Sequence, residues 1–260
     1  MSNILAITFS SDIFPAELIV SLGIITVILI LSLIVYFKSK KVDPLAKPKG
    51  IMLLAEMYVS FIDKTIGENL GIQFKKIAGA VYGGLYIYLF ACMLIGLLGF
   101  EAPMTFLYIP VTLGLTTFIL IHATAAYYNK WKYFHRYIEP LAFFLPINML
   151  SMWAPLLSLS FRLFGNAVAG YVIMKMVYWA FEPLTTAGGF ISAGSLVAPV
   201  LHAYFDVFSA YIQTTVYTLL SMALIKNEVP EDINTQKEKE YKESVARLEE
   251  IRNLTNAMNK

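Results

Sequence analysis

Apolar runs of membrane-spanning length alternate with short polar segments along this chain of 260 residues. Three of them, residues 18–37, 77–99 and 108–127, contain no charged residue and are about long enough to cross a hydrocarbon layer of roughly 30 Å as helices. Two further runs, 156–181 and 200–225, flank a glycine-rich turn and predict a long, tilted helical hairpin. The pattern therefore predicts an all-α integral membrane protein with about five transmembrane helices.

Two segments outside these runs have a different pattern. Residues 51–70 carry apolar positions at helical spacing, interrupted by a few charges, which predicts an amphipathic helix at the membrane interface. After Pro230 the chain turns polar, and we expect residues 226–260 to form a charged, helical cytoplasmic tail, either solvated or docked through a narrow apolar stripe. Residues 1–225 would then form the membrane domain.

Composition agrees with a membrane protein. Hydrophobic residues make up 58% of the chain and charged residues only 15%, with a mean hydropathy of +0.64, which excludes an ordinary soluble domain. The single cysteine, Cys92, excludes a disulfide framework and a cysteine metal site. The net charge of +2 gives no indication of nucleic acid binding, and no phosphate-binding or zinc-binding motif predicts a cofactor or a metal.

The placement of basic residues predicts the orientation, because Lys and Arg near span ends accumulate in the cytoplasm. Segments 38–76 and 128–139 and the tail from Lys226 hold 18 of the 20 basic residues. The charged residues of the loops on the opposite side are all acidic, such as Asp12, Glu17, Glu101 and Glu182. We therefore expect the N-terminus outside and the C-terminus in the cytoplasm. The other two basic residues, Arg162 and Lys175, lie inside the hairpin.

Arg162 is the most informative residue of the apolar runs. A guanidinium stays protonated in proteins and costs roughly 2.5 to 3.5 kcal/mol at the centre of a membrane helix, so such residues usually face a bundle interior or a hydrated path. Ser158, Arg162 and Asn166 are spaced four apart and therefore share one helix face. An alternative is that Arg162 only forms a buried ion pair, with Asp206 as the partner, that holds the hairpin together.

The last apolar run carries a second polar stripe, formed by His202, Asp206, Ser209 and Gln213 at intervals of four, three and four residues. Two polar stripes on adjacent apolar helices predict a hydrated path between them. Desolvation disfavours a charged carboxylate there, whereas a nearby guanidinium favours it, and this competition makes Asp206 the best candidate for proton exchange. His202 is either part of this path or a histidine at the membrane interface.

The segment SLSFRLFGNAVAG, residues 158–170, resembles subunit a of the rotary F-type ATP synthases. The agreement extends to PLAFFLPIN at residues 140–148 and to the final helix, in which Gln213 precedes VYTLLSMAL. The resemblance covers about residues 44–225. It implies a stator subunit without an active site of its own, in the plasma membrane of a bacterium. Its partners would be the rotating c-ring, peripheral stalk subunit b, the rest of the synthase and the lipid bilayer.

The resemblance also implies roles for single residues. Arg162 would be the stator arginine that faces the ring carboxylates and separates two proton half-channels. Proton flow through them would be coupled to ring rotation and to ATP synthesis or hydrolysis. Polar residues of the family pattern are matched by Ser158, Asn166 and Gln213.

Asp206 and Tyr171 occupy two further positions of the implied proton path. Asp206 falls where a histidine or glutamate of the family often lines the inlet half-channel. Tyr171 departs from the pattern, because the family commonly carries Glu or His there. Proton uptake would therefore rely on Asp206, with His202 one turn away.

Two other functions fit the same residues. In a proton-coupled secondary transporter, Arg162 would bind an anionic substrate and Asp206 would couple protons. In a membrane scaffold subunit, the amphipathic helix and the tail would anchor a soluble complex. A transporter would enclose its substrate cavity with its own helices, whereas a ring partner would expose Arg162 on a surface that another protein covers.

Overall fold

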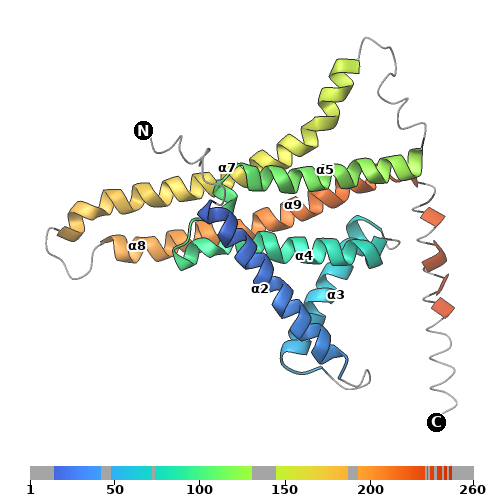
Figure 1. Ribbon diagram of the computed structural model, residues 1–260, viewed down its shortest axis with the longest axis horizontal. Helices are drawn as coiled ribbons and strands as arrows, with labels where there is room; N and C mark the ends of the chain where they lie inside the picture. The colour runs from blue at the N-terminus through green and yellow to red at the C-terminus, as the bar shows by residue number, and fades with distance from the viewer. Residues whose placement is uncertain are drawn as a thin grey trace.

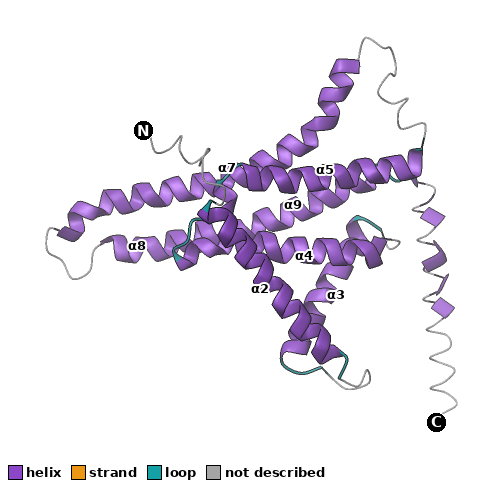
Figure 2. Ribbon diagram, viewed as in Figure 1, coloured by secondary structure: helices purple, strands orange, loops and turns teal. Residues whose placement is uncertain are grey.

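The computed structural model of this chain describes residues 15–41, 48–71, 74–130, 145–186 and 193–231, together with single positions between 233 and 247. Helices make up nearly all of these residues (Figure 2). Within the described residues, five helical segments are long and apolar enough to cross a membrane: Glu17–Ser39, Ile77–Leu98, Tyr108–Asn129, Leu150–Phe181 and Val197–Lys226. The prediction of an all-α membrane protein with about five transmembrane helices is confirmed.

Three helices form the centre of the bundle. α4 (Lys75–Leu94), α9 (Ser209–Lys226) and α5 (Tyr108–Asn129) run side by side in Figure 1, with α9 between the other two. α2 (Ala16–Ser39) crosses this group, and α3 (Ile51–Asn69) packs against α2, α4 and α9. The connection between α4 and α5 contains two short 3₁₀ turns and lies at one end of the bundle.

The last two spans form the helical hairpin. Its first arm is α7 (Leu145–Thr186). Its second arm consists of α8 (Ala193–His202), a π-helical turn (Ala203–Phe208) and α9. If straight, the 42 residues of α7 would extend about 63 Å at 1.5 Å per residue, which is about twice a hydrocarbon core of roughly 30 Å. A helix of this length either tilts in the membrane or extends beyond its hydrocarbon core.

α7 begins at Leu145, before the span predicted at residues 156–181, and Pro155 lies inside the helix. A proline leaves the carbonyl four residues earlier, that of Ser151, without its helical hydrogen bond, and prolines are the commonest cause of sharp bends. Figure 1 shows α7 bending along its first half. Membrane helices tolerate proline where neighbouring groups satisfy the freed carbonyl.

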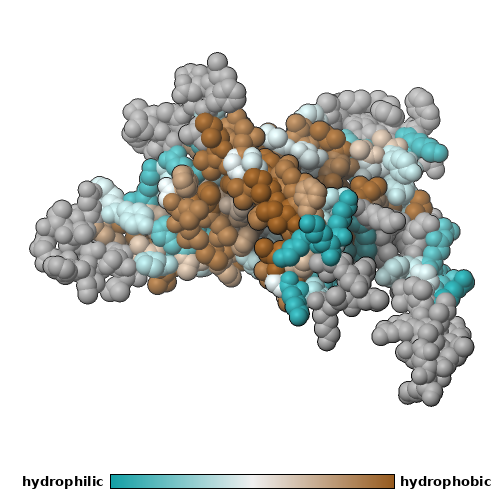
Figure 3. Space-filling model, turned by 60° about the horizontal axis from the view of Figure 1, so that its bottom comes forward, coloured by the Kyte–Doolittle hydropathy of each residue, from teal (hydrophilic) through white to brown (hydrophobic). Residues whose placement is uncertain are grey.

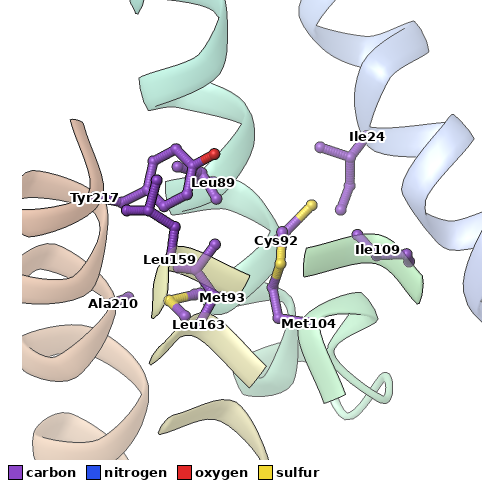
Figure 4. Packing of buried hydrophobic residues seen from close by; sticks show 10 residues of the cluster. All are labelled: Ile24, Leu89, Cys92, Met93, Met104, Ile109, Leu159, Leu163, Ala210 and Tyr217. Atoms are coloured by element: carbon purple, nitrogen blue, oxygen red, sulfur yellow. The ribbon is translucent and has the colours of Figure 1, made fainter. Parts of the chain in front are cut away.

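Buried apolar side chains join the hairpin to the other helices. One cluster contains Leu89 and Cys92 of α4, Leu163 of α7 and Tyr217 of α9 (Figure 4), and a second surrounds Ile66 of α3. Cys92 therefore acts as a small apolar core residue.

α5 and α7 approach each other closely at Gly114. A Cβ atom on Gly114 would overlap with Ser160 Oγ and lie 3.0 Å from the carbonyl oxygen of Leu156. Only glycine fits this position, so it fixes the distance between α7 and the bundle.

The outer surface of the helices is largely apolar. Leu22, Ile30 and Leu33 of α2 are about half exposed, and Figure 3 shows apolar side chains across the middle of the face that it presents. Such a surface suits lipid. The orientation across the membrane and the division at residue 225 stay predictions. Residues 1–14 and much of the tail lie outside the described residues.

Candidate functional site

The two predicted polar stripes meet between α7 and the second arm of the hairpin, which runs antiparallel to α7. Asn166 Nδ2 donates a hydrogen bond to Ser209 Oγ at 2.5 Å. One turn further along α7, a Cβ atom on Gly170 would lie 3.8 Å from Phe205 Cβ. The absence of a side chain on Gly170 thus lets the helices approach each other where the polar stripes face.

Asp206 is held by His202, one turn earlier on the same helix. The His202 ring bonds to the Asp206 carboxylate through Nδ1, and both side chains are largely buried. With a proton on Nδ1, the neutral ring accepts at Nε2 from the Tyr178 hydroxyl, 2.6 Å away on α7. The three side chains form a continuous hydrogen-bonded chain between the arms of the hairpin. Its inner end, Asp206, lies in the π-helical turn, a feature frequent at functional sites.

A partly open cavity of about 940 Å³ lies beside this chain of side chains. Asp206 and His202 line it from the second arm of the hairpin, Asn166 and Tyr171 from α7, and Glu101 from the connection between α4 and α5. Its size and its polar groups suit several water molecules. The structure therefore brings four of the predicted path residues to one cavity.

Glu101 is a candidate that sequence reasoning did not select for the path. The Tyr171 hydroxyl donates a hydrogen bond to Glu101 Oε1 at 2.9 Å. Lys175 Nζ lies 4.4 Å from the centre of the Tyr171 ring, and Lys175 also lines the cavity. Glu101 is the only charged residue in the α4–α5 connection, residues 95–107, and this was the available signal.

Arg162 lies apart from the cavity, on a face of α7 that no described residue covers. Leu159 and Leu163 are buried against the bundle, whereas Ser158 and Arg162 are exposed. Among the described residues, Arg162 has no hydrogen-bond or ion-pair partner. The ion pair with Asp206 considered above is not formed, since His202 bonds to that carboxylate.

Gln213 is placed at the level of Arg162 by the pairing of the two arms. Asn166 faces Ser209 and Gly170 faces Phe205, so the antiparallel register puts residue 162 opposite residue 213. The side-chain oxygen of Gln213 is buried and has no hydrogen-bond partner among the described residues. The two residues therefore share a level along the hairpin, while their side chains form no hydrogen bond with each other among the described residues.

Comparison with known proteins identifies the family of this chain. The sequence model of the family described as "ATP synthase A chain" matches residues 19–226. The chain is 34% identical to ATP synthase subunit a of Mycoplasma genitalium and 30% identical to that of Mycoplasma pneumoniae, each over 227 residues, covering 80% of this chain and 77% of the relative. It is also 28% identical, over 78% of this chain and 71% of the relative, to "ATP synthase subunit a, sodium ion specific" of Propionigenium modestum.

Proposed function

Because this chain belongs to the ATP synthase A chain family, whose members are the ion-channel stator subunit a of F-type ATP synthases, we propose that Arg162 faces carboxylates on a rotating c-ring. The predicted family, stator function and multi-pass location in a bacterial membrane are confirmed. As a channel subunit the chain has no catalytic site of its own. We further propose that the c-ring and peripheral stalk subunit b are its partners, and that single residues have the roles described below.

The exposure of Arg162 is the observation that carries the proposal. A guanidinium without a partner costs several kcal/mol at a membrane helix centre, so its counter-charge is expected from another molecule. Gly165 and Ala169 are exposed on α7 near Arg162, and such small residues let a second helix approach closely. Ser158, one turn away, would face the same partner. Gln213 lies at the same level along the hairpin, but no hydrogen bond joins its side chain to Arg162 among the described residues, so the chain itself leaves the guanidinium unpaired.

The charge of Arg162 explains how proton flow would turn the ring. A fixed positive charge favours the deprotonated form of a ring carboxylate opposite it and repels a proton that would pass directly. Protons must therefore travel bound to the ring carboxylates. Each charge that crosses the membrane releases about 2.3 kcal/mol per 100 mV, which is the energy available for rotation.

The cavity beside Asp206 would be the inlet half-channel. With the orientation that the basic residues predict, it lies on the outer side, where the α4–α5 connection is placed. Protons would pass from water to the pair of His202 and Asp206 and then, past Asn166 and Ser209, to a ring carboxylate near Arg162. His202 can hold a proton on its second nitrogen while Asp206 accepts from the first.

The position of Arg162 also favours the ring over a secondary transporter. A transporter would use Arg162 inside its substrate cavity, yet Arg162 is not among the residues that line the described cavity. A pure scaffold subunit would have no use for a cavity that holds His202 and Asp206.

Substitution of Arg162 tests the proposal. Arg162→Ala should abolish ATP-driven proton pumping by the complete complex in lipid vesicles, while subunit a and the ring still copurify. Arg247→Ala is the matched control, because Arg247 is an exposed arginine in the tail, and it should pump at the normal rate. Normal pumping by the Arg162→Ala complex would refute the proposed mechanism.

A further inference from the structure

Glu101 gives the cavity a second carboxylate, from the same connection whose Gly96 approaches Asp206: a Cβ atom on Gly96 would lie 3.9 Å from the Asp206 carboxylate. It reaches the cavity from the α4–α5 connection and accepts a hydrogen bond from Tyr171 on α7. Among the described residues that line the cavity, Asp206 and Glu101 are the two that carry a carboxyl group.

The backbone around Glu101 is firmly placed. Gly99 adopts a positive φ of 82°, a conformation that favours glycine, and turns the chain at the end of the 3₁₀ turn Ile95–Leu98 that follows α4. Met104 and Thr105 are buried just after Glu101, and the Thr105 hydroxyl donates to the carbonyl of Ala102 at 2.7 Å. Glu101 is thus held against the hairpin from both sides of its position in the chain.

Tyr171 cannot replace a carboxyl group as a proton carrier. A phenol keeps its proton at neutral pH, whereas a carboxyl group exchanges one with water. What Tyr171 does is hold the Glu101 carboxylate on the cavity wall with its hydroxyl. The Lys175 ammonium packs over the same ring and adds a positive charge to this wall.

We propose that Glu101 is the outer proton acceptor of the inlet half-channel and that Tyr171 is its positioning residue. A proton from outside water binds the Glu101 carboxylate, leaves it for cavity water, and is taken up by the Asp206 and His202 pair. Each transfer moves one proton and regenerates the carboxylate. This inference rests on the proposed function, because it assumes that the cavity conducts protons to the ring.

A simpler role for Glu101 would be to close the α4–α5 connection onto α7. Glu101→Gln separates the two roles. The amide oxygen still accepts the Tyr171 hydrogen bond, but the amide cannot bind and release a proton as a carboxyl group does. The double variant Glu101→Gln with Tyr171→Glu moves the carboxyl group to α7 within the same cavity wall.

Proton transport by the complete complex in lipid vesicles tests the inference. Glu101→Gln should lower the transport rate about tenfold, Tyr171→Phe should lower it about two- to threefold, and the double variant should recover at least half of the lost rate. Glu231→Gln, an exposed acid at the start of the tail, is the matched control and should transport normally. Copurification of the ring verifies assembly of each variant.

A normal rate for Glu101→Gln, or a double variant no faster than Glu101→Gln, would overturn the inference. Asp206→Asn, measured in parallel, separates this failure from that of the proposed function. If Asp206→Asn is slow and Glu101→Gln is normal, only the role of Glu101 is lost. If both are normal, the cavity does not carry the protons at all.

Discussion

Arg162 and Asp206 are charged residues on the two arms of one hairpin, yet their surroundings differ. Asp206 is largely buried and bonds to His202, which in turn contacts Tyr178. Arg162 is exposed on α7 and has no partner among the described residues. The site of Asp206 is completed within this chain, whereas that of Arg162 is left for another molecule to complete.

The difference shows how a stator can separate two tasks. In the proposed function, handling protons needs a hydrated pocket whose polar groups hold one another in place, and the Asp206 cavity is the proposed pocket. Setting the charge state of a passing carboxylate needs a fixed charge that is open to the passing group, and the exposed face of α7 provides that. Two arms of one hairpin can meet both needs because they are held in register.

The largest effect should come from a change that disturbs both sites together. Gly114→Val would push α7 away from α5, because a Cβ atom there overlaps with Ser160 Oγ. Overpacking of this kind costs about 1 to 3 kcal/mol, and we expect little subunit a in the purified complex. Gly84→Val is the matched control, since nothing lies within 4 Å of a Cβ on Gly84. Equal yields of the two variants would show that the close approach is not required.

A smaller effect should come from the proton-handling site alone. Asp206→Asn keeps a hydrogen-bonding group beside His202 but cannot release a proton, so proton delivery should slow on the order of 10- to 100-fold. Tyr171→Phe removes one hydroxyl and should slow it only about two- to threefold. Rates of ATP-driven pumping in vesicles measure both. Equal residual rates would remove Asp206 from its proposed role.

The smallest effect should come from the tail, which is remote in the sequence from Arg162 and Asp206. Tyr241 of the tail lies over Lys75 at the start of α4, where the Lys75 ammonium is 5.6 Å from the ring centre. Removal of residues 232–260 should therefore leave passive proton conduction through assembled complexes unchanged. Loss of that conduction would contradict a peripheral role of the tail.

Much of the fold and the importance of Arg162 follow from the sequence for simple physical reasons. A helix in lipid must be apolar over about twenty residues, so the spans are continuous in the sequence. A charge inside such a run is costly and therefore conspicuous, which identifies Arg162 directly. The polar stripe with His202 and Asp206 is likewise a local, periodic pattern along one helix.

The contacts between distant segments could not be predicted in this way. Tyr171 and Glu101 are 70 positions apart, and Tyr178 and His202 are 24 apart across the hairpin turn. Which side chains meet depends on how the helices are rotated and how far they slide, and periodicity does not fix either quantity. Periodicity also does not fix where α7 begins, because a proline such as Pro155 can bend a membrane helix without ending it.

Cross-linking tests most directly whether the partner of Arg162 lies on the ring. A cysteine at Gly165, on the exposed face of α7 near Arg162, can carry a photoreactive group, because the native Cys92 is buried and leaves little background. A cysteine at Ile30 of α2, which is also exposed, is the control. We predict that the group at position 165 captures the ring subunit, as identified by mass spectrometry, and that the group at position 30 does not. Capture of the ring at position 30 but not at 165 would contradict the account.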